Sequence, residues 1–416
     1  MARYYVETYG CTSNRGESQA IERELREAGH RPVESADAAD VAILNTCTVV
    51  ETTEDRMLRR AQALDDATSE LVVTGCMALA QGESFEEAGV DAEILHWDEV
   101  GEQIRNGECP TPPTEPTPLQ NGVVGILPIA RGCLSDCSYC ITKHATGTID
   151  SPPIEDNVAR AERLLDAGAR ELRITGQDTA VYGRDHGEWW LPELLDRICA
   201  LDGDFRVRVG MANPKGVHAI AEELASVFAR NDELYNFLHA PIQSGSDAVL
   251  DDMRRRHRSG DVADIVDVFD RHLDEWTFAT DVIAGFPTET PADHRQTVAA
   301  LRDHRPEKIN VTRFSKRPNT DADAMDGLGG QIKKDRSKEL TDVKMEIVGE
   351  AHEAMVGTER EVLFVEDGTG ESLVGYDRTH RQIAVPAAQE LGFSVGDRAR
   401  VEVRDHERVY ALGDPV

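Results

Sequence analysis

Short apolar runs alternate with amphipathic stretches over the first hundred residues. Three runs, at residues 4–9, 41–44 and 71–73, are rich in the branched and aromatic side chains typical of buried strands. Between them, apolar residues recur at helical spacing over 17–28 and 53–64. This βαβαβ order predicts parallel strands joined by crossover helices. We therefore assign residues 1–105 to a first α/β domain.

A longer alternation of strand and helix patterns follows a proline-rich segment. Residues 107–118 carry repeated prolines, which predict an extended and fairly stiff linker within 106–122. The predicted strands beyond it are 125–129, 171–175, 206–209, 236–239, 277–283 and 308–314. The predicted helices are 155–167, 192–201, 216–229, 246–256, 261–272 and 291–303. The pattern indicates a partial (β/α)6 barrel over residues 123–350.

The pattern changes again after residue 350. Five short strand-like runs separated by turn residues lie at 361–365, 372–376, 382–385, 399–403 and 409–412. Short strands at such spacing predict a small β-barrel of the oligonucleotide-binding type over 354–416. The whole chain is thus expected to be an α/β protein with a parallel α/β domain, a partial barrel and a small C-terminal β-barrel.

Three cysteines directly follow the first strand of the predicted partial barrel, in the array Cys133-x3-Cys137-x2-Cys140. Thiolates are the ligands of iron–sulfur clusters, and four of them fill every iron of a 4Fe-4S cluster. Three leave one iron open to chelate the amino and carboxylate groups of S-adenosylmethionine. The alternative is a Cys3His zinc site completed by His144, which would not explain the motifs further along the chain.

A second set of three cysteines follows the strands of the first domain. Cys11, Cys47 and Cys76 each come shortly after one of the three apolar runs. The carboxyl ends of parallel strands meet at one edge of a sheet, so these thiols can converge on a second three-thiol site. The alternative is that they are small buried hydrophobic residues. Cys109, in the linker, and Cys199, in a helical pattern, belong to neither set.

Polar or glycine-rich segments follow the other strands of the predicted barrel. Enzymes with barrel folds build their sites from loops at this face. The side chains or backbone expected to touch a cofactor or substrate there belong to Tyr139, Gly176, Gln177, Asp178, Asn213, Gln243 and Ser244. The alternatives are a core aromatic for Tyr139 and a strand-to-helix turn with a capping carboxylate at Asp178.

Composition indicates the cellular environment in which the protein is expected to work. The 416 residues carry a net charge of −32, and only 8 of the 45 basic residues are lysine. An acidic surface without a long acidic run suggests a salt-rich, halophilic cell interior that screens self-repulsion. Eight cysteines in ligand-like patterns fit a reducing cytoplasm. No signal-like stretch and no run of 18 apolar residues is present, so we expect a cytoplasmic protein without a membrane partner.

The three parts in this order resemble the radical-SAM methylthiotransferases, whose chains end in a TRAM domain. The resemblance covers nearly the whole chain. It rests on the cysteine motifs at residues 45–49, 74–76 and 131–140 and on the segments 239–254 and 280–287. Segments 208–214 and 314–320 are similar to the archaeal and eukaryotic branch that modifies N6-threonylcarbamoyladenosine. Asn319 stands where a glycine is commoner in that branch.

The resemblance implies an enzyme that adds a methylthio group to C2 of threonylcarbamoyladenosine 37 in tRNA. It implies two 4Fe-4S clusters, on Cys11, Cys47 and Cys76 and on Cys133, Cys137 and Cys140, with S-adenosylmethionine cleaved to a radical at the second. The partners are then tRNA, an electron donor such as a ferredoxin or flavodoxin, and a sulfur donor that the sequence does not identify. The alternatives are methylthiolation of isopentenyladenosine 37 or of a ribosomal-protein aspartate, and a non-enzymatic iron–sulfur redox sensor.

Clusters of basic residues are the candidates for contact with such a substrate. One is the run 253–258, and another comprises Lys333, Lys334, Arg336 and Lys338. Both can bind tRNA phosphates or form solvated helix faces. The threonylcarbamoyl group is anionic and needs a cation or amide donors. Candidates after the sixth predicted strand are Arg313, Lys316 and Arg317; the alternative is a solvated loop.

Overall fold

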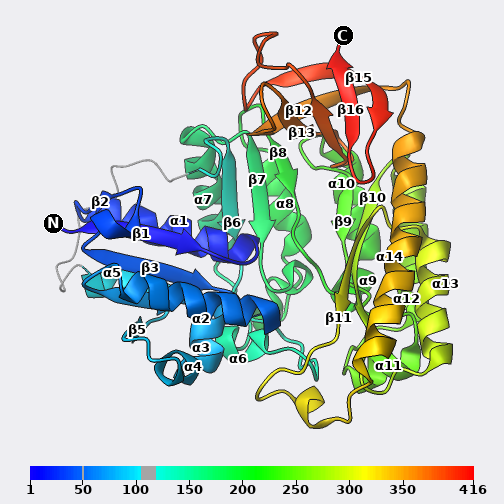
Figure 1. Ribbon diagram of the computed structural model, residues 1–416. Coiled ribbons are helices and arrows are strands. Elements are labelled where there is room, and N and C mark those ends of the chain that lie inside the picture. The colour runs from blue at the N-terminus through cyan, green and yellow to red at the C-terminus, as the bar shows by residue number, and fades with distance from the viewer. Residues whose placement is uncertain (49–50, 105–118) are drawn as a thin grey trace.

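The computed structural model describes residues 1–48, 51–104 and 119–416. These residues form an N-terminal parallel sheet with its helices, a central α/β part and a C-terminal β-barrel (Figure 1). The predicted linker at 107–118, with Cys109, lies outside the described residues. No helix within the described ranges is both long and apolar enough to cross a membrane.

The N-terminal part is a five-stranded, fully parallel sheet in the order β2-β1-β3-β4-β5. Its strands are β1 (Arg3–Thr8), β2 (Arg31–Pro32), β3 (Val41–Thr46), β4 (Leu71–Thr74) and β5 (Glu93–Ile94). Its helices are α1 (Thr12–Glu27), α2 (Glu51–Asp65), α3 (Gly75–Gln81), α4 (Glu83–Glu87) and α5 (Trp97–Ile104). β3 and β4 are buried along their whole length, as strands covered on both faces are. The expected parallel order is confirmed.

The central part carries six parallel strands in two groups, β6-β7-β8 and β11-β10-β9. A parallel bridge between Val207 and Leu234 joins the groups into one curved wall. The strands are β6 (Val124–Pro128), β7 (Glu171–Thr175), β8 (Arg206–Arg208), β9 (Phe237–His239), β10 (Thr277–Ala284) and β11 (Lys308–Arg313). Apolar side chains on the outer face of this wall, such as Leu172 and Val207, pack under the helices in the largest hydrophobic core of the described residues.

The helices that cover the wall are α7 (Ile154–Asp166), α8 (Leu191–Cys199), α9 (Pro214–Ala219), α10 (Ala221–Arg230), α12 (Ser259–His272), α13 (Pro291–His304) and α14 (Gly330–Glu353). Two short helices, α6 (Thr142–Thr146) and α11 (Asp247–Asp252), lie at the strand ends. The predicted helix 216–229 is divided at Ile220. The predicted helix 246–256 stops at Asp252, because Arg254 adopts the left-handed conformation with φ of 55°.

The N-terminal part contacts the central wall near the carboxyl ends of its first strands. Helix α1 packs so closely on β6 that a Cβ atom on Gly16 would stand 2.9 Å from Ile126 Cγ2. Ser13 Oγ lies 2.9 Å from Thr175 Oγ1 at the end of β7, and α3 contacts α6. Figure 1 shows the blue N-terminal layer beside α6 and the ends of β6 and β7. This contact brings both sets of cysteines to one region.

The C-terminal part is a closed five-stranded barrel in the order β12-β13-β14-β16-β15. Its strands are β12 (Glu359–Asp367), β13 (Leu373–Tyr376), β14 (Gln382–Val385), β15 (Arg398–His406) and β16 (Ala411–Pro415). Neighbouring strands are antiparallel except β14 and β16. The small barrel expected from the strand spacing is confirmed as a fold, and its full closure leaves no exposed sheet edge.

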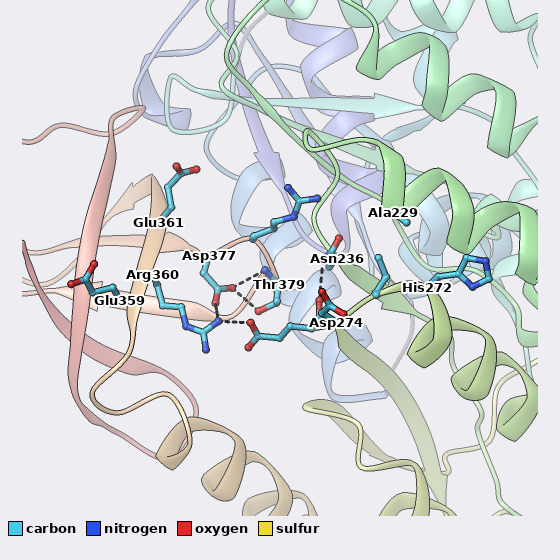
Figure 2. A pocket seen from close by; sticks show the side chains of 12 residues that line it. Ala229, Asn236, His272, Asp274, Glu359, Arg360, Glu361, Asp377 and Thr379 are labelled. Atoms are coloured by element: carbon cyan, nitrogen blue, oxygen red, sulfur yellow. Dashed lines mark hydrogen bonds and ion pairs between the residues drawn. The ribbon is translucent and has the colours of Figure 1, made fainter.

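This barrel docks against the amino ends of all six central strands, opposite to the N-terminal part. The core residues that it contacts lie just before or at the start of a strand; they are Asn121, Arg170, Arg206, Asn236, Glu275 and Glu307. A hollow of about 420 Å³ lies between the two parts. Figure 2 shows Arg360 and Asp377 at this hollow. Arg360 forms ion pairs with Asp377 at 3.6 Å and with Glu275 at 2.6 Å.

Arg381 provides a test of this docking. Its guanidinium donates to both carboxylate oxygens of Glu307, one of them at 2.7 Å, and also pairs with Glu275, while its side chain is only 11% exposed. Arg381→Ala leaves Glu307 without its cation and Glu275 with Arg360 alone, so we expect a loss of about 2–3 kcal/mol in unfolding free energy. Limited proteolysis should also release the C-terminal barrel sooner.

Arg400→Ala is the matched control for Arg381→Ala. Arg400 lies in the same barrel and pairs with Glu359 at 3.8 Å, but its side chain is 78% exposed. Exposed pairs contribute little, so we expect less than about 0.5 kcal/mol of destabilisation. Equal losses in the two variants, measured by denaturant unfolding, would contradict the docking role of Arg381.

Candidate active site

The three N-terminal cysteines lie at the carboxyl ends of three adjacent parallel strands. Cys11 precedes α1 after β1, Cys47 directly follows β3, and Cys76 stands in the first turn of α3 after β4. A Cβ atom on Gly10, next to Cys11, would approach the Cys47 Cβ to 3.0 Å. The negative charges of Cys11 and Cys47 are among the causes that raise the pKa of Cys76. The three thiols therefore lie at one edge of the sheet, and their sharing of one cluster stays a prediction.

A buried amide network fixes the loops that carry these cysteines. Asn14 Nδ2 donates to Asn45 Oδ1 at 2.9 Å, and Asn45 Nδ2 donates to the Asn14 carbonyl at 2.9 Å. Gly75, beside Cys76, has φ of 87°, and a Cβ atom there would stand 2.3 Å from Asn45 Oδ1. Asn45 thus links all three loops. Asn14 was not predicted, although an amide three residues after a candidate ligand is a signal that the sequence offers.

The loop after β6 presents Cys133, Cys137 and Cys140 at the carboxyl end of the central wall. The Gly132 amide donates to Gln177 Oε1 at 2.8 Å, and the Ser138 amide donates to the Met253 carbonyl at 3.0 Å. The loop is therefore held by the segment after β7 and by the C-terminal end of α11. Burial raises the pKa of Cys133 and of Cys140, so the free thiolates are unfavourable here without a positively charged partner.

Arg255 supplies a positive charge beside this loop. Its Nη1 lies 3.8 Å from Cys137 Sγ, and its Nη2 donates to the Pro241 carbonyl at 2.8 Å. Its Nε is buried without a hydrogen-bond partner in the described structure. Arg255 belongs to the basic run at 253–258, which the sequence analysis considered for tRNA phosphates or as a solvated helix face. The left-handed turn at Arg254 instead directs it inward, toward the cysteine loop.

The two sets of cysteines face one another. Helix α3, which carries Cys76, contacts α6, which follows Cys140. The pKa of Cys76 is raised by burial first, then by Glu17 and by the thiols of its own set and of Cys140. Burial also raises the pKa of Glu17 to about 7. A chemical group bound at either set would therefore lie close to the other.

Three of the predicted polar residues position the cysteine loop and its neighbours. Gln177 accepts from Gly132, as described above. Asn213 caps α9 by accepting from the Lys215 amide at 3.1 Å, and its Nδ2 donates to Ser135 Oγ at 3.2 Å. The buried Asp178 carboxylate accepts from the Asn213 amide at 2.9 Å, and burial raises the pKa of Asp178 to about 6. These contacts connect the ends of β6, β7 and β8.

The remaining predicted residues differ in accessibility. Tyr139 packs edge-on against Phe286, with ring centroids 6.4 Å apart, in a small apolar cluster. Gly176 and Gln243 are half-buried, and Gln243 has φ of 65°. Ser244 is only 2% exposed, and its Oγ lies 3.3 Å from Thr297 Oγ1. The Ser244 side chain is thus packed against α13, and its contact with a ligand stays a prediction.

The cations expected after β11 are largely engaged by the protein itself. Arg317 is buried rather than solvated, and its Nη1 forms an ion pair with Glu54 Oε2 of α2 at 2.8 Å. Lys316 donates to the Asp323 carbonyl, and Arg313 is exposed. In the second basic group, Arg336 pairs with the buried Glu289 at 2.6 Å. Arg317 therefore joins the N-terminal part to the central part.

The three thiols of each set have the chemistry of iron–sulfur ligands. Among residues 1–48, 51–104 and 119–416, no three His, Cys, Asp or Glu side chains lie close enough to share one ion. Each iron of a cluster binds its own thiolate, so cluster ligands stand farther apart than the ligands of one ion. His144, the fourth ligand of the alternative zinc site, is exposed on α6.

Comparisons with known proteins agree with this geometry. Residues 3–95 match the model described as Uncharacterized protein family UPF0004, and residues 127–301 match the Radical SAM superfamily. A probable threonylcarbamoyladenosine tRNA methylthiotransferase of Archaeoglobus fulgidus is 33% identical, over 99% of this chain and 98% of its own. The threonylcarbamoyladenosine tRNA methylthiotransferase of Danio rerio is 31% identical, over 100% of this chain and 79% of its own.

Solved structures show the same fold at low sequence identity. The radical S-adenosylmethionine methyltransferase TsrM from Kitasatospora setae has a TM-score of 0.58 at 14% identity, covering 77% of this chain and 76% of TsrM. The cobalamin-dependent radical enzyme OxsB has a TM-score of 0.54, covering 84% of this chain and 56% of OxsB. These two relatives, above 30% identity and matched over 98% and 79% of their own lengths, establish the family. The chain belongs to the radical-SAM tRNA methylthiotransferases and is an S-adenosylmethionine-dependent enzyme.

Proposed function

We propose that this enzyme adds a methylthio group to C2 of N6-threonylcarbamoyladenosine 37 in tRNA. The observation that carries the proposal is the juxtaposition of two three-cysteine sets, with Cys76 of one set beside Cys140 of the other. Transfer of a sulfur group to an unactivated carbon requires a sulfur source and a radical source at one substrate. The names of the relatives supply the substrate, threonylcarbamoyladenosine in tRNA.

Two 4Fe-4S clusters fit the two sets of thiols. Cys11, Cys47 and Cys76 would hold one at the edge of the N-terminal sheet, and Cys133, Cys137 and Cys140 would hold the other at the mouth of the central wall. When bound, the clusters and S-adenosylmethionine supply the transferable sulfur and the 5′-deoxyadenosyl radical. The protein holds the two sites in register, through α1 on β6 and α3 on α6.

The residues around the second site have complementary tasks. Gln177 and Asn213 hold the loop of Cys133 and its neighbour Ser135 in place, and Gly176 leaves space for a ligand beside them. Tyr139 and Gln243 are half-buried at the same mouth and are available to contact S-adenosylmethionine. Arg255 neutralises part of the negative charge at Cys137.

The partners follow from this chemistry. The C-terminal barrel is proposed to be a TRAM domain, and tRNA is proposed to approach the mouth where the two cysteine sets meet. A ferredoxin or flavodoxin would supply the electron. Four of the barrel's arginines form ion pairs that involve central residues; they are Arg360, Arg378, Arg381 and Arg398. These side chains contribute to docking and are not free to bind phosphates.

Mass spectrometry of tRNA nucleosides tests the proposed substrate. Reconstituted enzyme with S-adenosylmethionine, a sulfide source and reductant should convert threonylcarbamoyladenosine to its 2-methylthio derivative in tRNA. Isopentenyladenosine tRNA and ribosomal protein should remain unchanged, because the anionic substituent requires polar recognition. Equal conversion of isopentenyladenosine, or conversion of a ribosomal protein alone, would refute the substrate and leave the radical-SAM family unaffected. Reductive cleavage of S-adenosylmethionine also distinguishes an enzyme from a redox sensor.

Iron content and partial reactions test the two-cluster assignment. Anaerobically prepared enzyme should contain about eight irons per chain, and Cys11→Ala/Cys47→Ala/Cys76→Ala should contain about half of that number. This variant should still form 5′-deoxyadenosine but should transfer no methylthio group, because its sulfur-bearing site is lost. Cys199→Ala is the control, since Cys199 is buried on α8 away from both sets. Zinc in the purified protein, or an unchanged iron content in the triple variant, would contradict two clusters.

The contact of Arg255 with Cys137 has an electrochemical consequence. A cation that hydrogen bonds to a cluster thiolate favours the reduced cluster, so Arg255→Gln should lower its midpoint potential by roughly tens of millivolts. The measurement is a potentiometric titration followed by electron paramagnetic resonance. Arg256→Gln is the matched control, because Arg256 is exposed and pairs with Asp136 at 3.2 Å. Equal potentials in Arg255→Gln and the native enzyme would exclude this role.

A further inference from the structure

The inner face of the central wall carries positive charge close below the mouth. Leu172, Ile174 and Val207 pack outward under the helices. Because side chains alternate along a strand, Arg173 of β7 and Arg208 of β8 point to the opposite, inner face. The two arginines are direct neighbours in the parallel register of β7 and β8. Two guanidinium groups therefore stand side by side inside the curved wall.

The two arginines differ in their partners. Arg173 Nε forms an ion pair with the buried Glu171, which also accepts a hydrogen bond from Tyr235 Oη at 2.8 Å. Within the described part of the chain, the Arg208 guanidinium makes no hydrogen bond and no ion pair. It lies over the face of the Phe237 ring, 5.0 Å from the centroid. Arg208 is thus a cation whose hydrogen-bond donors are all available.

The surroundings do not neutralise this charge. Lys308 of β11 also lies over the Phe237 ring, at 5.1 Å, and its Nζ approaches His380 Nδ1 to 2.9 Å. The Asp281 carboxylate on this face is bound by His239 at 3.1 Å and Asn310 at 2.6 Å. Burying an arginine halfway without a paired anion costs free energy, and a bound anion would offset that cost.

The position of Arg208 suits a group that enters from the mouth. It stands two residues before Gly210, in the segment whose Asn213 reaches Ser135 of the cysteine loop. A strand rises about 3.3 Å per residue, so the step of two residues from Arg208 to Gly210 places Arg208 about 7 Å below the mouth. Asn310 on the same inner face is exposed, so solvent reaches this face. Tyr376 and His380 of the C-terminal barrel, with ring centroids 4.1 Å apart, bound this face on the barrel side, where His380 lies 4.7 Å from the Phe237 ring.

We propose that Arg208, with Arg173 beside it, binds the carboxylate of the threonylcarbamoyl group on the inner face of the central wall. The inference rests on the proposed function, which supplies the substrate. A guanidinium matches a carboxylate with two parallel hydrogen bonds, which gives geometric selection as well as charge. Of the three loop cations expected from the sequence, Arg317 is bound to Glu54 and Lys316 to a backbone carbonyl, so the exposed Arg313 remains as the competing site.

The test compares three anticodon stem-loop RNAs that differ only at position 37. They carry threonylcarbamoyladenosine, the same nucleoside with its carboxylate replaced by a neutral carboxamide, or plain adenosine. Native enzyme should bind the first more tightly than the second by roughly ten- to a hundredfold, as expected for hydrogen bonds to a charged group. Arg208→Gln should remove this preference without weakening the binding of plain adenosine RNA.

Two further variants make the result specific. Arg313→Gln tests the competing loop cation, because Arg313 is an exposed arginine at the carboxyl end of β11; with the carboxylate at Arg208, this variant should keep the native preference. Arg208→Lys keeps the charge but loses the planar fork, so it should retain a reduced preference. It provides the same comparison if the glutamine variant does not fold, as judged by thermal unfolding.

The possible results distinguish a wrong role for Arg208 from a wrong proposed function. A native preference for the carboxylate that survives in Arg208→Gln, or that is lost in Arg313→Gln, overturns the role of Arg208 and leaves the proposed function intact. Native enzyme that neither prefers threonylcarbamoyladenosine over plain adenosine nor methylthiolates it overturns the proposed function, and the carboxylate site with it.

Discussion

The direction of parallel strands is the constraint on which the rest of the structure depends. All strands of a parallel sheet end at the same edge, so residues that follow successive strands are collected there. The N-terminal sheet uses this edge for one set of cysteines, and the central wall uses its own for the other. Both edges must then meet. Gly16 has no Cβ atom, so α1 can approach β6 closely and the two edges can meet.

The strands that precede the cysteines were predictable because the sequence patterns that indicate them are local. Apolar runs followed by cysteines located β1, β3, β4 and β6, and strict alternation of strands and helices gave the partial barrel. Helix α14 was missed, although Leu340, Val343 and Ile347 recur at helical spacing and are buried. Many charged residues lie between them, so their periodicity is weak beside that of the other helices.

Side-chain roles at the site were less predictable, because they depend on backbone turns that composition does not reveal. Nothing in the run 253–258 distinguishes Arg255, which reaches Cys137, from Arg254 and Arg256, which pair with surface carboxylates. Arg317 likewise looks like a loop residue until the fold brings Glu54 to it. For Ser244, the sequence did not reveal that tertiary packing buries the side chain against Thr297.

The docking of the C-terminal barrel has a mechanical consequence for the opposite end of the molecule. The central wall is an open arc, in which β6 and β11 are edge strands that do not pair with each other. Hydrogen bonds between edges therefore do not set its curvature. A closed barrel that contacts the start of every strand acts as a rigid template for this arc. Substitutions in the last sixty residues can thus change the width of the mouth, some five residues of strand away, without touching any residue that lines it.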